Sequence, residues 1–198
     1  MDTLVNGAFS DSVSVYDRGL AYGDGVFETI AVHKGESLLL AAHMQRLQQG
    51  CRRLGIPVPA MEQCCTEIEQ LCSGRTGILK LVVTRGAGTR GYAAPGDIQP
   101  TRILLFSPWL AYPEHFYKQG IQTAICSIRV AEQEQLAGLK HLNRLENVLA
   151  AQEILGSNLQ EGLMLDCKDR IIECTRSNIF FVKDGELHTP ALDRCGID

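Results

Sequence analysis

Apolar residues recur along residues 40–54 at alternating intervals of four and three positions, which places them on one face of an α-helix. Gly55 follows directly, and a glycine at this position commonly ends a helix. Residues 26–32, which precede this segment, form a strand-like apolar run that ends in the Lys34-Gly35 turn. The chain therefore begins by mixing strands and helices, which indicates an α and β fold.

A second, weaker helical pattern covers residues 61–72. Two segments that look like buried strands follow at residues 77–83 and 102–106, with a glycine-rich loop between them. Residues 108–113 begin and end with proline and predict a linker. We therefore expect a small N-terminal α/β domain over residues 1–107.

The second predicted domain, residues 114–198, opens with a strand over residues 122–130. A loop then leads to Lys140, where we expect a helix that ends at Gly156. One side of this helix carries Leu142, Leu145, Leu149 and Ile154. Short strands are expected at residues 162–166, 170–174, 178–182 and 186–188.

Composition narrows the class of function. The 198 residues are 45% hydrophobic, which is enough for a buried core. The net charge of −4 and the lack of a basic run argue against nucleic acid and favour a small-molecule substrate. The N-terminal sequence does not resemble a signal peptide, and no apolar run is long enough to span a bilayer. We predict a cytoplasmic protein with no membrane partner.

The eight cysteines indicate neither disulfides nor a metal site. A disulfide framework is typical of short secreted chains, and this chain is neither short nor predicted to be secreted. No Cys-x-x-Cys pair is present, and no histidine stands at ligand spacing. We expect reduced, mostly buried thiols and no metal.

Lys140 is the first candidate for chemistry. A lysine held at the junction of a loop and a helix can project into a cavity and form a Schiff base, provided that desolvation or a neighbouring cation helps it to lose its proton. His141 and Arg144 are local candidates for that influence. A lysine at a helix start is nevertheless most often a solvated surface charge, and Lys80, inside an apolar strand, is the better buried lysine on pattern alone.

Glu173 is the second candidate, because a carboxylate at a strand end can pair with a protonated pyridine nitrogen. The alternative is an edge-strand glutamate in water. Ser177 and Asn178 lie in the polar turn that follows, and their side chains can bind a ligand or cap the turn. On the 40–54 helix, Arg46 with His43 can bind phosphate or can simply be solvated.

A glycine-dense loop covers residues 17–25. Its glycines do not match the spacing of a dinucleotide-binding or P-loop motif, and no basic residue follows where a P-loop requires one.

Taken in order, these motifs resemble those of the fold-type-IV pyridoxal-phosphate enzymes, and most closely those of the aminodeoxychorismate lyase family. The likeness covers essentially the whole chain. The matching segments are Asn6-Gly7, Asp17-Arg18-Gly19, residues 23–29, residues 43–47, Arg85-Gly86 with Arg90-Gly91-Tyr92, residues 139–146 and residues 173–180.

The resemblance implies a two-domain α and β fold like that of D-amino acid aminotransferase, with pyridoxal 5'-phosphate as the cofactor. Lys140 would hold the cofactor as a Schiff base and shuttle protons. Glu173 would pair with the ring nitrogen, while Arg46, Ser177 and Asn178 would seat the phosphate end. The candidates for contact with substrate are Tyr22, Phe27, Thr29, Arg90 and Tyr92.

The activity implied is conversion of 4-amino-4-deoxychorismate to 4-aminobenzoate and pyruvate, a step of folate biosynthesis. The sequence His141-Leu142-Asn143-Arg144 favours the lyase over the aminotransferases of the class. A branched-chain or D-amino acid aminotransferase is the first alternative.

A non-catalytic scaffold protein is the second alternative, because the chain stops two residues after Gly196, where the family continues into a phosphate-binding helix. The resemblance thus implies a truncated large domain and weak cofactor binding by these 198 residues. It also implies a homodimer.

Overall fold

The computed structural model describes residues 2–94 and 96–198. The chain divides into two compact units. The first contains the residues up to Ala111 together with Lys140–Asn143, and the second contains Tyr112–Leu139 and Arg144–Asp198. Lys140–Asn143 therefore belongs to the unit built by the N-terminal half of the chain, which the sequence did not predict.

The first unit is built on a six-stranded antiparallel sheet in the order β2-β1-β6-β5-β3-β4. The predicted strands at 26–32, 77–83 and 102–106 are confirmed as its three long strands. The three short strands were not predicted, because two or three residues carry no measurable periodicity. The strands are β1 (Thr3–Val5), β2 (Ala8–Phe9), β3 (Gly25–His33), β4 (Glu36–Ser37), β5 (Gly77–Thr84) and β6 (Thr101–Pro108).

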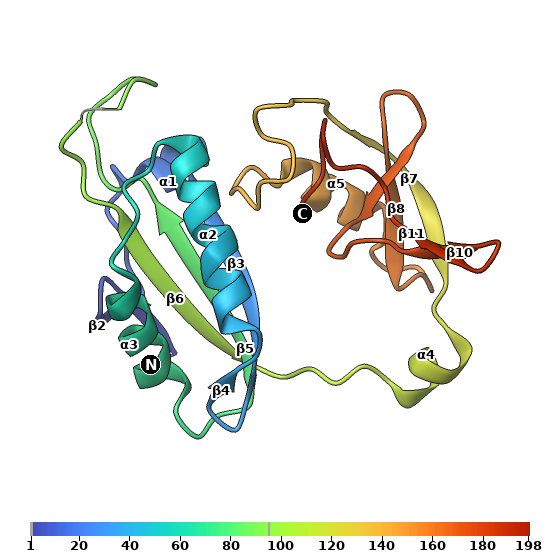
Figure 1. The fold of residues 1–198 in the computed structure, drawn as a ribbon, viewed down its shortest axis with the longest axis horizontal. Helices are drawn as coiled ribbons and strands as arrows, with labels where there is room; N and C mark the ends of the chain where they lie inside the picture. The colour runs from blue at the N-terminus through green and yellow to red at the C-terminus, as the bar shows by residue number, and fades with distance from the viewer. Residues whose placement is uncertain (1, 95) are drawn as a thin grey trace. The chain divides into compact units, whose positions relative to one another are not determined.

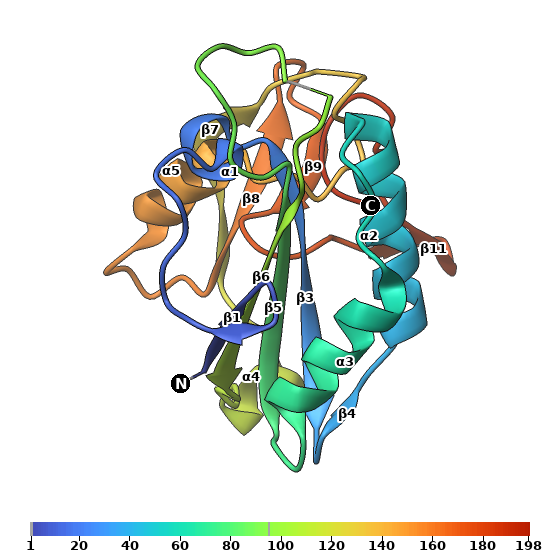
Figure 2. The ribbon, with the colours of Figure 1, turned by 90° about the vertical axis from the view of Figure 1, so that its left-hand side faces the viewer.

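Side chains alternate across β3, as the pleat of a strand requires. Val26, Ile30 and Val32 are buried on one face, and α2 (Leu40–Leu54) and α3 (Met61–Cys72) cover that face (Figures 1 and 2). The remaining helix of this unit, α1 (Arg18–Tyr22), is a single short turn ahead of β3.

The predicted helices over residues 40–54 and 61–72 are confirmed, and Gly55 ends α2 in the left-handed conformation with φ of 64°. Gly50 faces β3. A Cβ there would come within 3.0 Å of Val26 Cγ1, so the glycine allows α2 to approach the strand closely.

A buried ion pair joins a helix to the sheet in the core of the first unit. Arg102 of β6 and Glu67 of α3 are both buried, and Arg102 Nη2 lies 2.7 Å from Glu67 Oε1. A second bond from Arg102 Nε makes the contact bidentate. The pair joins α3 to β6 of the sheet. Removing either partner would be destabilising, because the other charge would stay buried without compensation.

The second unit contains a three-stranded sheet in the order β7-β8-β9, in which β7 and β8 are parallel and β8 and β9 antiparallel. Cys126 and Met164 of the sheet form its small core together with Ala150 of α5. The elements are α4 (Glu114–Gln119), β7 (Thr123–Val130), α5 (Leu145–Ile154), β8 (Glu161–Asp166), β9 (Ile171–Cys174) and the β10 (Phe181–Lys183) and β11 (Glu186–His188) hairpin.

Two predictions for this unit were wrong in detail. α5 begins at Leu145 and not at Lys140, and Leu145 and Leu149 are exposed, whereas Ala150 faces the core. The reason is that apolar residues lie all round this helix, so periodicity does not select its buried face. The strand expected at 178–182 is β10, which begins only at Phe181.

Within the described residues, no helix combines the length and apolar character needed to cross a bilayer. The same residues contain no cluster of three or more histidine, cysteine, aspartate or glutamate side chains arranged to hold a metal ion.

The expectation of reduced, mostly buried thiols is confirmed: all eight cysteines are free, six are buried, and Cys167 is exposed. Burial, with a small contribution from Cys64, raises the pKa of Cys51 to about 12. Burial likewise raises the pKa of Cys195 to about 11.

We therefore expect iodoacetamide at about pH 8 to alkylate Cys167 first in the folded protein, since only the thiolate reacts and buried thiols stay protonated. Peptide mass mapping after short exposure would measure this, and Cys167→Ser should remove the fast event. Equally fast labelling of Cys51 in the folded protein would contradict the burial described.

Candidate active site

The Lys140 segment is attached to the free edge of β3. The amide of Phe27 donates to the carbonyl of Lys140 at 2.9 Å, and the amide of Leu142 donates to the carbonyl of Gly25 at 3.0 Å. His141 forms an antiparallel bridge with Val26 between these two bonds. This edge is available because β5 pairs with the opposite side of β3 and β4 pairs only with its last residues. Lys140 is thus held as an added strand residue.

The side chain of Lys140 is half-buried and lies beside the ring of Phe27, with Nζ 4.8 Å from the ring centroid. Lys80 Nζ lies 5.0 Å from the same centroid, so both are within cation–π range. Lys80 is exposed on β5, and the pattern that suggested a buried lysine there was wrong. Thr29 is also exposed, on the same face of β3 as Phe27.

Arg46 lies on α2 against the buried carboxylate of Glu28. Its Nε donates to Glu28 Oε1 at 2.7 Å and its Nη2 to Glu28 Oε2 at 2.5 Å. His43 Nδ1 lies 2.8 Å from Glu28 Oε2. Glu28 has no exposed surface, while about a third of the Arg46 side chain is exposed. The Glu28 carboxylate therefore fixes the orientation of the Arg46 guanidinium. This guanidinium is the group that the sequence predicted as a phosphate ligand.

Glu173, at the end of β9, is a buried carboxylate whose two oxygens both accept hydrogen bonds. Oε1 accepts from Asn147 Nδ2 at 3.2 Å, and Oε2 accepts from the amide of Ile197 at 2.9 Å. The charge of Glu173 also acts on Arg144: burial lowers the pKa of Arg144, and the charges of Glu173 and Glu146 oppose that shift. The alternative of a solvated edge-strand glutamate is therefore wrong for Glu173.

Gly196 packs directly against this carboxylate. Its φ is +84°, and a Cβ would come within 2.7 Å of Leu192 and 2.8 Å of Ile172, with Glu173 Oε2 at 3.4 Å. Only glycine meets both demands at once. The backbone around Gly196 thus closes over Glu173 from one side and supplies the amide that binds it.

Glu161, the first residue of β8, organises the turn that contains Ser177. Its carboxylate is buried and accepts hydrogen bonds from the amides of Gly162 and Thr175 and from the Thr175 hydroxyl. Arg176 Nε lies 3.3 Å and Ser177 Oγ 3.4 Å from its other oxygen. The turn is therefore fixed by one acidic side chain, and Asn178 follows it in an exposed position.

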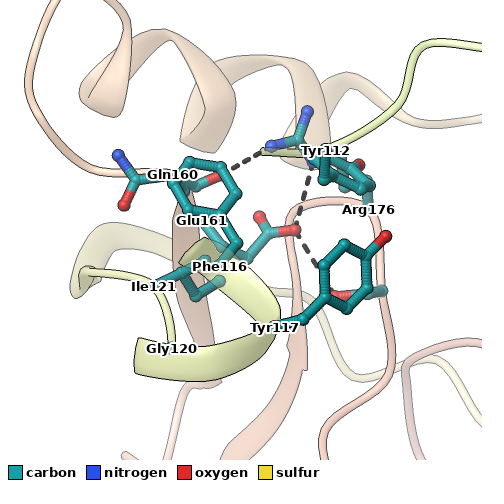
Figure 3. A pocket seen from close by; sticks show the side chains of 9 residues that line it. Tyr112, Phe116, Tyr117, Gly120, Ile121, Gln160, Glu161 and Arg176 are labelled. Atoms are coloured by element: carbon teal, nitrogen blue, oxygen red, sulfur yellow. Dashed lines mark hydrogen bonds and ion pairs between the residues drawn. The ribbon is translucent and has the colours of Figure 1, made fainter. Parts of the chain in front are cut away.

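A cavity of about 440 Å³ borders this turn in the second unit (Figure 3). Aromatic and aliphatic side chains form most of its lining, and the Glu161–Arg176 ion pair forms a polar part of its wall. The principal lining residues are Tyr112, Phe116, Tyr117, Ile121, Glu161 and Arg176.

Arg90 and Tyr92 lie in the loop between β5 and β6, and both are exposed. The ring centroid of Tyr92 lies 5.3 Å from that of Tyr22, at the end of α1. The structure therefore brings Tyr22 and Tyr92 together, while Phe27 lies beside Lys140 and Thr29 shares its face of β3.

The model of the family described as amino-transferase class IV matches residues 25–198. The chain belongs to this family. A crystal structure of 4-amino-4-deoxychorismate lyase from Pseudomonas aeruginosa is 50% identical, with a TM-score of 0.94, and the match covers 98% of this chain and 72% of that one. The two-unit α and β fold is thus that of the class IV aminotransferases.

Two relatives compared by sequence are each 34% identical. An aminodeoxychorismate lyase from Vibrio harveyi is matched over 98% of this chain and 72% of its own length. A putative branched-chain-amino-acid aminotransferase from Methanocaldococcus jannaschii is matched over 96% of this chain and 68% of its own length. The class IV family thus includes relatives named as lyases and relatives named as aminotransferases.

Pyridoxal phosphate is the cofactor of this family. The side chains present fit it chemically, because an aldehyde needs an amine, a pyridinium nitrogen a carboxylate, and a phosphate guanidinium and hydroxyl donors. The first unit offers Lys140 and Arg46. The second offers the Glu173 carboxylate and the side chains of Ser177 and Asn178.

Three residues with clear roles at these groups were not predicted from the sequence: Glu28, Asn147 and Glu161. Each supports another side chain, and none belongs to a pattern that points to chemistry. Glu28 offered a weak signal, since it is the only charged residue in the apolar β3 run. A charge at an inward-facing strand position must find a buried partner.

Asn147→Ala should destabilise the protein by about 2 kcal/mol, because Glu173 Oε1 and the carbonyl of Thr175 both lose a buried donor. Gln152→Ala, at an exposed position of the same helix, is the control and should cost less than about 0.5 kcal/mol. Urea unfolding followed by circular dichroism would compare them. Equal effects would mean that Asn147 does not support Glu173.

Proposed function

We propose that this protein is a pyridoxal-phosphate-dependent lyase that converts 4-amino-4-deoxychorismate to 4-aminobenzoate and pyruvate. The observation that carries the proposal is the 50% identity and TM-score of 0.94 with the lyase from Pseudomonas aeruginosa. The Vibrio harveyi lyase and the Methanocaldococcus jannaschii aminotransferase are both 34% identical, so the structural match is what favours the lyase. The attachment of Lys140 to the edge of β3 supports the same conclusion, because a catalytic amine needs a fixed backbone.

When bound, pyridoxal phosphate supplies an electron sink for the carbon that carries the substrate nitrogen. In this proposal, Lys140 Nζ removes the proton from that carbon and later delivers it to the methylene carbon of the departing enolpyruvyl group. The bond between the ring carbon and the ether oxygen breaks, the ring becomes aromatic, and the moved proton ends in the methyl group of pyruvate. No other reactant is consumed.

The other groups bind and orient. In this proposal Glu173, held by Asn147 and the Ile197 amide, keeps a proton on the cofactor's ring nitrogen. Arg46, oriented by Glu28, and the side chains of Ser177 and Asn178 are proposed to bind the phosphate. Pre-positioning by buried partners lowers the reorganisation that binding and catalysis require.

A homodimer is part of the proposal, and it rests on the resemblance to the fold-type-IV class. The cytoplasmic location expected from the sequence stays a prediction.

The two lysines beside Phe27 allow a matched test of the attachment point. We expect borohydride treatment of the cofactor-loaded protein to leave a pyridoxyl group on the peptide that contains Lys140 and none on the peptide that contains Lys80. Lys140→Ala should abolish the adduct, whereas Lys80→Ala should retain it. An adduct on Lys80 in the unmodified protein, seen by peptide mass mapping, would refute the assignment.

Product analysis separates the lyase from its nearest rival. We expect 4-aminobenzoate and pyruvate to appear in equal amounts from 4-amino-4-deoxychorismate. Exchange of amino groups between branched-chain or D-amino acids and 2-oxoglutarate should be at least about a hundredfold slower, because the site would stabilise a different transition state. Chromatography of both reactions measures this ratio. A ratio in favour of amino exchange would replace the lyase with an aminotransferase.

A further inference from the structure

Arg18 is a buried arginine in the short helix α1, with only 4% of its surface exposed. Asp17 caps this helix by accepting from the amide of Gly19, and it also accepts from the Thr84 hydroxyl at the end of β5. The Arg18 amide itself donates to the carbonyl of Gly86. α1 is thus joined to the start of the loop that connects β5 and β6.

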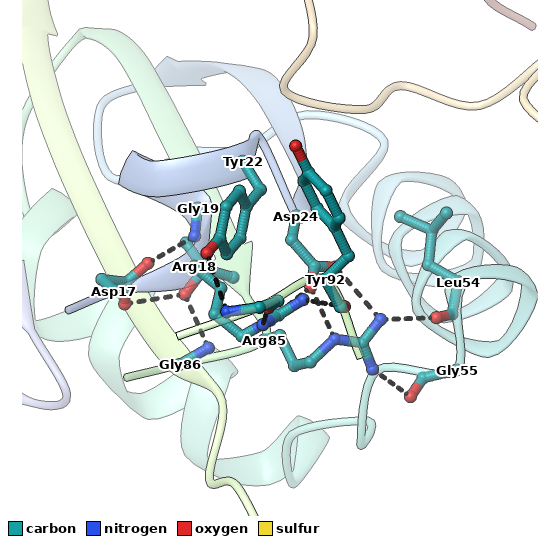
Figure 4. A network of polar contacts seen from close by, with 12 residues as sticks. Asp17, Arg18, Gly19, Tyr22, Asp24, Leu54, Gly55, Arg85, Gly86 and Tyr92 are labelled. Carbon is teal, nitrogen blue, oxygen red and sulfur yellow. Dashed lines mark hydrogen bonds and ion pairs between the residues drawn. The ribbon is translucent and has the colours of Figure 1, made fainter. Parts of the chain in front are cut away.

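The guanidinium of Arg18 holds the far part of the same loop (Figure 4). Its Nη1 donates to the carbonyl of Gly91 at 2.8 Å, and its Nη2 donates to the carbonyl of Tyr92 at 2.6 Å. Its Nε donates to Asp24 Oδ2 at 2.9 Å. Three separate nitrogens of one planar group therefore donate to three acceptors in a fixed geometry. An ammonium group carries all its donors on a single nitrogen and cannot reproduce this arrangement.

Asp24, which accepts from Arg18, also accepts a bidentate contact from Arg85 and is thereby held in place (Figure 4). Arg85 in turn donates to the carbonyls of Leu54 and Gly55 at the end of α2. Burial raises the pKa of Asp24, but the hydrogen bonds and charges of Arg85 and Arg18 outweigh it and hold that pKa below its usual range. Asp24 is therefore an anion that binds both arginines and, through Arg85, connects Arg18 to the end of α2.

The loop that Arg18 holds carries two exposed side chains, Arg90 and Tyr92, on either side of Gly91. Gly91 has φ of +113°, a conformation that residues with a side chain rarely adopt, and its amide lies 3.3 Å from the Tyr22 hydroxyl. The loop backbone is thus fixed at the two carbonyls that Arg18 binds, and the exposed side chains of Arg90 and Tyr92 flank that point.

We propose that Arg18 is a positioning residue that sets the conformation of the 86–92 loop, so that Arg90 and Tyr92 are presented in one arrangement to an anionic substrate. This part of the inference rests on the proposed function, in which the substrate carries two carboxylates. A guanidinium and a phenol at fixed separation suit one carboxylate, because each supplies directional donors. A mobile loop would lose this selectivity through the entropy of ordering both side chains.

Limited digestion with trypsin reads the loop directly, because Arg90 is a cleavage site at its exposed tip. Arg18→Lys keeps the charge but removes the pair of hydrogen bonds to the carbonyls of Gly91 and Tyr92. It should therefore speed cleavage after Arg90 about tenfold or more. Arg102→Lys makes the same change in a buried arginine–glutamate pair away from this loop's contacts with Arg18 and should leave cleavage after Arg90 near the wild-type rate.

Gly91→Ala provides a second variant that leaves Arg18 intact. A Cβ at Gly91 meets no atom within 4 Å, so the change strains only the loop backbone. It should also speed cleavage after Arg90. The proposal is overturned if Arg18→Lys and Gly91→Ala both cut at the wild-type rate, or if Arg102→Lys accelerates cleavage as much as Arg18→Lys does.

Steady-state kinetics test the presentation of substrate. We expect Arg18→Lys to raise KM for 4-amino-4-deoxychorismate about tenfold with a smaller change in kcat, whereas Arg102→Lys should leave both near wild type. An unchanged KM with a loosened loop would overturn the role in substrate binding. If the wild-type protein forms no 4-aminobenzoate, the proposed function fails, while the trypsin comparison still decides whether Arg18 holds the loop.

Discussion

The alternation of side chains along β3 decides where most of the candidate functional groups of the first unit lie. The face of β3 that packs under α2 carries Glu28, which orients Arg46. The opposite face carries Phe27, beside which Lys140 lies. The free edge of the same strand binds the backbone of Lys140. One strand therefore organises a cation, an amine and an aromatic ring, and a slip of one residue in its register would exchange its two faces.

Buried carboxylates perform the corresponding task elsewhere in the chain. Glu161 and Glu173 in the second unit are buried, Asp24 in the first is half-buried, and each is surrounded by N–H or hydroxyl donors. Burying a carboxylate is unfavourable unless such donors satisfy it, so each of these sites needs a specific local backbone. In return, the side chains that they contact are held in one orientation before any ligand binds. This is the condition for a precise binding site.

The groups proposed to act in catalysis suit any pyridoxal-phosphate enzyme of this family, because an amine, a carboxylate and phosphate ligands serve lyases and aminotransferases alike. Choice of reaction depends on what surrounds the substrate. The loop held by Arg18 supplies exposed groups of the right chemistry for that choice, and its conformation is set by contacts that involve no cofactor-binding residue. The two proposals thus assign substrate selection and cofactor binding to separate hydrogen-bond networks in this chain.

The sequence by itself determined the long regular elements, because β3, β5, β6, α2 and α3 each contain enough residues for a clear periodicity. Motif order also selected Lys140, Glu173 and Arg46 as candidates. Only the tertiary structure decided that the Lys140 segment pairs with the edge of β3, although the residues before and after it in the sequence belong to the second unit. That pairing links residues far apart in the chain. The sequence carried only a weak signal for the supporting role of Glu28 and none for those of Asn147 and Glu161, because a hydrogen-bond partner is fixed by three-dimensional proximity and leaves no periodic trace in the sequence.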